Sequence, residues 1–131
     1  MKITALIVCV AVVAGLYVRL APSDPTRWHI DPLTAPDPGQ GGVLQRVEGA
    51  GPDALARFET LLKSEPRTDH LAGETSEGRI TYIARSKWIG FPDYITAAQD
   101  GDDLVVLSRL RFGSSDLGVN RARLERLLQR L

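Results

Sequence analysis

The fold is decided by three neighbouring segments, RITYIARS (79–86), PDYITAA (92–98) and DLVVLSRLRF (103–112). Each segment contains several β-branched or aromatic residues, and sequences typical of turns separate them, at Gly90 and at QDGD (99–102). Short strands joined by short turns pair with their neighbours along the chain. The three segments therefore predict an antiparallel sheet.

Two further strands and a helix extend this unit towards the N-terminus. Residues 70–74 are a weaker strand candidate, and VLQRVEG (43–49) is typical of a short strand. The sequence GPD (51–53) opens a helix that ends before Pro66, because proline suits the first turn of a helix and disfavours helix in the residue before it. The apolar residues of this helix recur at helical spacing: Leu55, Phe58, Leu61 and Leu62.

The last helix begins after Ser115 or Asp116, either of which can cap it, and runs to residue 131. Helical spacing predicts one core-facing stripe of leucines: Leu117, Leu124, Leu127, Leu128 and Leu131. Asn120 and Arg121 fall within that stripe, so their polar groups need hydrogen-bond partners. The opposite face is either a solvated surface or a contact for anionic lipid or an acidic partner, and it carries Arg123, Arg126 and Arg130.

The N-terminal segment predicts a membrane anchor. Residues 3–18 contain no charged side chain and lie between Lys2 and Arg19. At about 1.5 Å per residue, a helix extended to residue 21 approaches the ~30 Å thickness of the bilayer core. A cleaved signal peptide is the alternative, but the segment lacks a good cleavage site, so we expect residues 1–21 to be an uncleaved anchor. We expect a single pass of the inner membrane with the body in the periplasm.

Residues 22–42 contain five prolines and a Gly-Gln-Gly-Gly run, a composition that disfavours helix and central strand. We expect a tether between the anchor and an α+β domain at 43–131, in which four to five antiparallel strands pack against two helices. Trp28 interrupts the tether, and its apolar bulk predicts that part of the tether docks on the domain or lies at the membrane interface.

The composition excludes several classes of site. With one cysteine, Cys9, and two histidines, the chain cannot form a disulfide framework or a multi-Cys/His zinc site. The formal net charge is zero, although residues 22–108 carry eight basic and fourteen acidic side chains and residues 109–131 carry six arginines and two acids. We expect no cofactor, no metal and no nucleic-acid partner.

The densest polar group spans residues 108–123, from the end of the third strand into the last helix. Arg109 and Arg111 are two residues apart and so share one sheet face, and the turn at Ser115 leads into a helix start that favours an anion. These groups can hold a phosphate or carboxylate, with Asn120 and Arg121 as further candidates. The alternative is structural: Asp116 caps the helix and pairs with Arg109, Arg111 or Arg121. No nucleophile elbow, phosphate loop or dinucleotide fingerprint is present.

Two stretches, TYIARSKWIGFPDYIT (81–96) and SRLRFGSSDLGVNRARLERLL (108–128), resemble the signature segments of the bacterial and plastid domain-of-unknown-function family DUF1499. Leu110 departs from the pattern, which has a small polar residue there. The resemblance covers about residues 43–131 and implies no known activity, catalytic residue or cofactor. The positions that match the pattern are Asp93, Ser108, Arg109, Arg111, Gly113, Ser115, Asp116, Gly118, Asn120, Arg121 and Arg123.

From these features we expect a non-enzymatic periplasmic domain, tethered to the membrane, that serves as an accessory or assembly partner of an inner-membrane protein complex. A single anchor, a small domain without a recognisable active centre and an uneven charge distribution favour this hypothesis. A domain that binds a small anion or a lipid headgroup is the second hypothesis, and a hydrolase of unknown substrate is the third.

Overall fold

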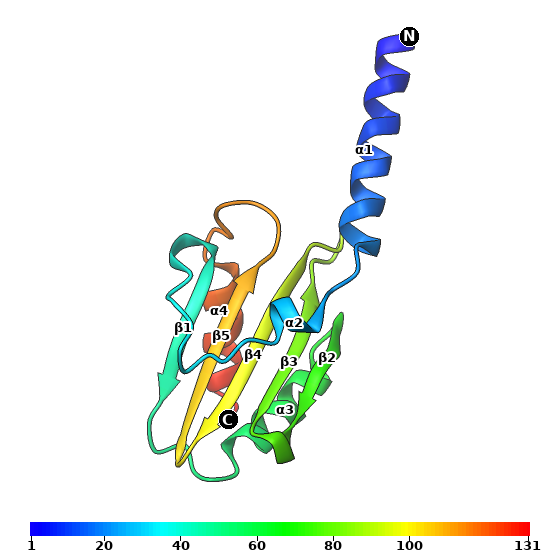
Figure 1. Ribbon diagram of the computed structural model, residues 1–131. Coiled ribbons are helices and arrows are strands. Elements are labelled where there is room, and N and C mark those ends of the chain that lie inside the picture. The colour runs from blue at the N-terminus through cyan, green and yellow to red at the C-terminus, as the bar shows by residue number, and fades with distance from the viewer.

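The computed structural model describes residues 1–131 and has an N-terminal helix attached to an α+β domain (Figure 1). The helix α1 (Lys2–Leu20) is long and apolar enough to cross a membrane, and none of its residues is buried. The strands are β1 (Gly42–Val47), β2 (Thr68–Glu74), β3 (Arg79–Arg85), β4 (Pro92–Asp100) and β5 (Asp103–Leu110). The helices of the domain are α2 (Pro25–Trp28), α3 (Ala54–Ser64) and α4 (Val119–Leu128), with short 3₁₀ turns η1 (Gly39–Gly41) and η2 (Thr75–Glu77).

The five strands form one antiparallel sheet in the order β1-β5-β4-β3-β2. The three segments quoted from the sequence are its central strands, β3, β4 and β5. Their register places Ile95 opposite Tyr82 on one side and opposite Ser108 on the other. The predicted α+β class and antiparallel sheet are confirmed.

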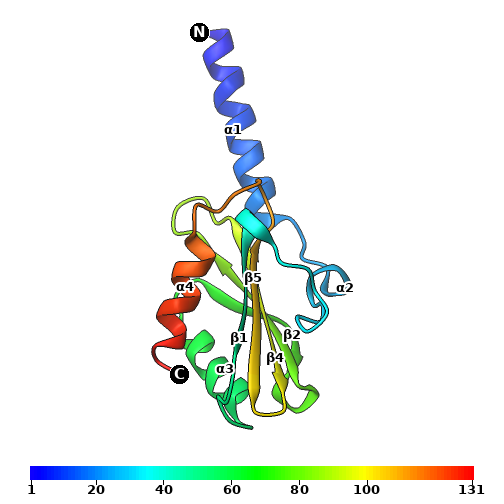
Figure 2. The same ribbon diagram turned by 90° about the vertical axis from the view of Figure 1, so that its left-hand side faces the viewer.

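Both helices of the predicted core, α3 and α4, cover one face of the sheet (Figure 2). Side chains alternate between the faces of a strand, so every second residue of β3, β4 and β5 points into this layer. The core of the domain lies here and contains Phe58, Leu62, Leu124 and Leu127 from the helices and Ile80, Tyr82, Ile95, Ala97, Leu104 and Val106 from the sheet.

The opposite face is covered by the proline-rich segment. Trp28 is only 5% exposed, and its ring stacks on Tyr94 of β4 with the ring centroids 4.0 Å apart. Next to it, the His29 ring bonds to the Thr81 hydroxyl over 2.7 Å, and Thr81 in turn bonds to Thr96 over 2.8 Å. Part of the predicted tether therefore docks on the domain, which was one of the two alternatives for Trp28.

The start of α4 differs from the prediction. The helix begins at Val119, because Leu117 and Gly118 adopt left-handed backbone angles (φ 55° and 81°) that a helix cannot contain. Leu117 is consequently 93% exposed and not part of the leucine stripe, and Arg121 is exposed as well. With Asn120 buried, the positions three and four residues later also face inward, so Arg123 turns towards the sheet and not towards solvent.

Candidate functional site

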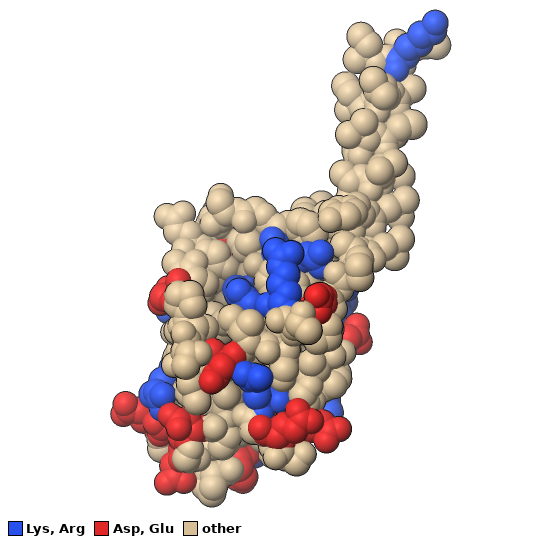
Figure 3. Space-filling view, viewed as in Figure 1, with Lys and Arg blue, Asp and Glu red and all other residues tan.

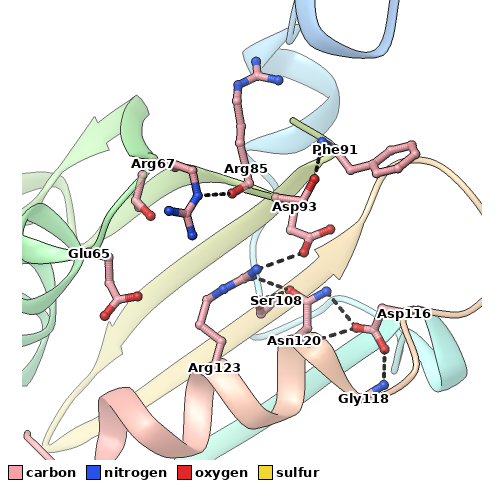
Figure 4. Close-up of polar contacts among 12 residues, drawn as sticks. Glu65, Arg67, Arg85, Phe91, Asp93, Ser108, Asp116, Gly118, Asn120 and Arg123 are labelled. Carbon is pink, nitrogen blue, oxygen red and sulfur yellow. Dashed lines mark hydrogen bonds and ion pairs between the residues drawn. The ribbon is translucent and has the colours of Figure 1, made fainter. Parts of the chain in front are cut away.

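A polar network lies beneath the N-terminal end of α4 (Figure 4). The Arg123 guanidinium donates to the Asp93 carboxylate over 3.1 Å and to the side-chain oxygen of Asn120 over 3.2 Å. The same Asn120 oxygen accepts a short hydrogen bond from the Ser108 hydroxyl, and the Asn120 amide donates to Asp116 over 2.7 Å. Strand β4 supplies Asp93, strand β5 supplies Ser108, and the loop before α4 supplies Asp116, so the network joins the sheet to the last helix.

Asn120 is the centre of this network and is completely buried. A buried amide destabilises a protein unless its polar atoms find partners. Here its oxygen accepts two hydrogen bonds and its nitrogen donates one, and no buried side-chain nitrogen or oxygen lacks a partner anywhere in the chain. The expectation that Asn120 sits on the core-facing side and needs hydrogen-bond partners is therefore confirmed.

The pKa values of the two carboxyl groups of the network, Asp93 and Asp116, shift in opposite directions. Burial raises the pKa of Asp93, although the Arg123 guanidinium acts in the other direction. Burial also acts to raise the pKa of Asp116, but hydrogen bonds from the Asn120 amide and from the backbone N–H groups of Gly118 and Asn120 outweigh it, so the net shift is downward. Asp116 accepts hydrogen bonds from N–H groups at the start of α4, but the N-cap residue is Gly118 and not Ser115 or Asp116 as predicted. No ion pair joins Asp116 to Arg109, Arg111 or Arg121, so the predicted pairing is wrong.

A cavity of about 520 Å³ opens beside this network. Its wall combines polar and apolar side chains from the residue before β2, the end of β3, the start of β4, the end of β5 and the start of α4. The residues that line it are Arg67, Arg85, Ser86, Phe91, Asp93, Leu110, Phe112, Ser115, Asp116, Val119 and Arg123. A volume of this size falls within the range of small-molecule sites in proteins.

Two arginines of the cavity lack an acidic partner. Arg67 donates from Nε to the Arg85 carbonyl over 3.2 Å, and Arg85 donates to the Gly90 carbonyl over 3.1 Å, but neither forms an ion pair. Figure 4 shows the Arg67 side chain on the same side of the sheet as Arg123, whereas the Arg85 guanidinium points away from the network. The cavity therefore contains one guanidinium, that of Arg67, whose charge no carboxylate offsets.

Arg109 and Arg111 lie on the other face of the sheet, as their odd positions on β5 require. The expectation that they share a face is confirmed, but Ser115 and Asp116 lie on the helix side, so the structure does not bring the four residues together. Together with Arg27, the two arginines surround the Trp28 ring, with guanidinium carbons 4.8 to 5.9 Å from its centroid. Burial and the neighbouring Arg27 lower the pKa of Arg109. Figure 3 shows basic side chains gathered on this face below α1.

The predicted arginine stripe of α4 is divided by the structure. Arg123 belongs to the buried network, Arg126 forms a bidentate ion pair with Glu65 at 2.6 and 2.9 Å, and Arg130 is exposed. The stripe therefore does not form one free basic surface. Nothing in the sequence pointed to Arg67, Arg85 or Phe91 as cavity residues, because they meet Asp116 only through the tertiary fold. No group of three or more His, Cys, Asp or Glu side chains is placed to hold a metal ion.

Comparison with known proteins gives a family and no further detail. Neither a curated protein nor a solved structure is similar enough to this chain to count as a match. The sequence model of the family described as "Protein of unknown function (DUF1499)" matches residues 18–131. This match begins well before residue 43, where the resemblance was placed, and so includes the segment that carries Trp28, in agreement with the burial of that side chain. The chain therefore belongs to the DUF1499 family.

Proposed function

We propose that the protein is a membrane-anchored binding domain whose cavity holds an amphiphile with an anionic headgroup. The observation that carries this proposal is the guanidinium of Arg67, which has no acidic partner and faces a cavity with an apolar wall. That wall is formed by Phe91, Leu110, Phe112 and Val119. A phosphate or carboxylate bound between Arg67 and Arg123 forms charge-assisted hydrogen bonds, and an attached apolar group covers the aromatic rings.

The position of the cavity supports a ligand that comes from the membrane. The Phe112 ring, which lines the cavity, packs edge-on against Tyr17 in the last turn of α1, with ring centroids 6.1 Å apart. Because α1 is the segment able to span a bilayer, the cavity lies beside the end of that span. A lipid headgroup and a free phosphate have the same binding chemistry here, and only the lipid also supplies the apolar group.

The test uses the full-length protein in mild detergent, titrated with short-chain phosphatidylglycerol and observed by native mass spectrometry. We expect Arg67→Gln to weaken phosphatidylglycerol binding by about ten- to a hundredfold, because it removes one charge-assisted hydrogen bond of roughly 1.5–3 kcal/mol. Arg130→Gln is the matched control, because Arg130 is exposed on α4 and does not line the cavity. Binding that is equal in both variants would exclude the cavity as the site.

Two further ligands in the same titration identify the chemistry. Phosphatidylcholine of the same chain length tests the need for net negative charge, and inorganic phosphate tests the need for the apolar group. If the site requires both negative charge and an apolar group, only phosphatidylglycerol binds. If inorganic phosphate binds as tightly as phosphatidylglycerol, the ligand of the cavity is a small anion and not an amphiphile.

A second candidate is the accessory partner of an inner-membrane complex, with the domain in the periplasm. No residue of α1 is buried, which favours this candidate, because such a helix can contact another spanning helix as well as lipid. If the domain is in the periplasm, protease added to spheroplasts should digest residues 43–131. Protection of these residues would place the domain in the cytoplasm.

Co-purification in mild detergent tests whether there is a partner, and a chain with an unrelated spanning helix in place of α1 is the control. An identical set of proteins with both chains would contradict the partnership.

A further inference from the structure

The end of the domain nearest α1 is formed by two loops, residues 86–91 after β3 and residues 111–118 after β5. Figures 1 and 2 both show these loops at the end of the sheet from which α1 departs. The loop tips expose large apolar side chains: Trp88, Ile89, Leu117 and also Phe91, which lines the cavity as well. Trp88 is 82% exposed. A cluster of exposed apolar residues on a small domain marks a contact with a membrane or a protein.

Contacts with α1 set the depth of both loops relative to a bilayer. Tyr17 packs against Phe112 of the second loop, and Arg19 lies so close to the first loop that a Cβ on Gly90 would be 3.1 Å from its Nε atom. When α1 spans the membrane, Tyr17 and Arg19 lie where the hydrocarbon core meets the headgroups. Side chains that extend from the two loops therefore reach the same depth.

The chemistry of the loops fits a lipid surface. Trp88 is the residue type enriched at membrane interfaces, and the neighbouring Lys87 ammonium lies 5.1 Å from its ring centroid, where it can also meet lipid phosphate. Residues 86–91 contain no acidic side chain. The one acid of the second loop, Asp116, is turned inward to Asn120. No carboxylate of these loops is thus positioned to repel an anionic headgroup.

Positive charge lies on the adjoining face. Arg27, Arg109 and Arg111 surround Trp28 and form no ion pair with any carboxylate. Arg111 donates to the carbonyl of Pro22 over 2.9 Å. Pro22 is two residues beyond the end of α1, so the Arg111 guanidinium lies close to the end of that helix. Basic side chains this close to an anionic leaflet are attracted to it.

We propose that the two loops insert Trp88, Ile89 and Leu117 into the bilayer interface, so that the domain rests on the membrane with the Arg27, Arg109 and Arg111 cluster beside anionic headgroups. The occupant of this surface is the lipid bilayer that α1 spans. The proposal does not depend on the cavity ligand, because loop insertion requires only the exposed side chains and their depth.

The experiment uses the full-length protein in nanodiscs made with brominated lipid, which quenches tryptophan fluorescence inside the bilayer. The fluorescence of Trp88 is the difference between the fluorescence of the wild-type protein and that of Trp88→Tyr. Trp28, which is buried against Tyr94, remains in the variant as the internal reference. We expect Trp88 to be quenched by bromine near the headgroups and shielded from aqueous acrylamide. Quenching of Trp88 by acrylamide alone would place the loops in water and overturn the proposal. Shielding of Trp88 from both quenchers would show a protein cover and overturn it as well.

Two sets of variants separate the apolar and electrostatic contributions. Leu117→Asn should reduce Trp88 quenching by lipid without unfolding the domain, because asparagine tolerates the positive φ at this position. Leu33→Asn is the control, an exposed leucine far from both loops in sequence. Adding about one third phosphatidylglycerol to phosphatidylcholine nanodiscs should increase the quenching, and Arg27→Gln combined with Arg111→Gln should abolish that increase. Unchanged quenching in Leu117→Asn together with no response to phosphatidylglycerol would contradict the insertion.

Discussion

Trp28→Ala should lower the free energy of unfolding of the full-length protein by about 3–5 kcal/mol, the usual cost of removing a buried tryptophan. Trp28 is 5% exposed, stacks on Tyr94 and has the Arg109 guanidinium 4.8 Å from its ring centroid. Its removal exposes the tether-covered face of the sheet and leaves three neighbouring guanidiniums without the aromatic ring that they contact.

Urea unfolding in mild detergent measures this loss, and limited proteolysis shows whether residues 22–42 have left the sheet. Leu33→Ala is the matched control, because Leu33 belongs to the same segment but is exposed. We expect the control to unfold like the wild-type protein and to keep the segment protected. If Trp28→Ala behaves like the control in both measurements, the docked segment contributes nothing to the stability of the domain.

Arg123→Met should also destabilise the protein by about 3–5 kcal/mol, because it leaves the Asp93 carboxylate buried without its cation. The side chains of this pair are 14% and 13% exposed, and burial raises the pKa of Asp93 even with Arg123 present. Without Arg123, the pKa of Asp93 in the folded state rises further above the unfolded value of about 3.9.

This shift determines the pH dependence. A carboxyl group whose folded pKa exceeds its unfolded pKa stabilises the fold fully below the unfolded value and loses that contribution as the pH rises through the folded value. The deficit of Arg123→Met relative to the wild-type protein should therefore be small near pH 4 and reach its full size at pH 7. Adding Asp93→Asn to Arg123→Met should recover stability at pH 7, and Arg130→Met should have no effect at either pH. An equal deficit at both pH values would show that Arg123 acts through packing and not through its charge.

The sequence by itself predicted the sheet. The segments 79–86, 92–98 and 103–112 became β3, β4 and β5 within two residues at each end, because β-branched residues and turn sequences act locally. The apolar N-terminal helix, the helix after GPD (51–53) and the DUF1499 resemblance were predictable for the same reason, since each depends on a contiguous run of residues.

The start of α4 required the structure. Two left-handed residues, Leu117 and Gly118, delay the helix, and a leucine at that position gives no sign of its backbone angle. The delay removed Leu117 from the leucine stripe but did not change the side of α4 that the later residues face. Arg123 was expected on the outside, but it lies three residues after the buried Asn120 and four before the buried Leu127, and so it reaches the buried network with Asp93.

The composition of the candidate site was also decided by tertiary structure. From the sequence, Arg109, Arg111 and Asp116 form one polar group, but strand alternation and the turn into α4 place the arginines against Trp28 and the aspartate against Asn120. The cavity instead gathers Arg67, Phe91 and Asp116 from distant parts of the chain. Local sequence determines the strands and helices, whereas the sides on which they meet depend on packing between residues that the sequence does not place next to one another.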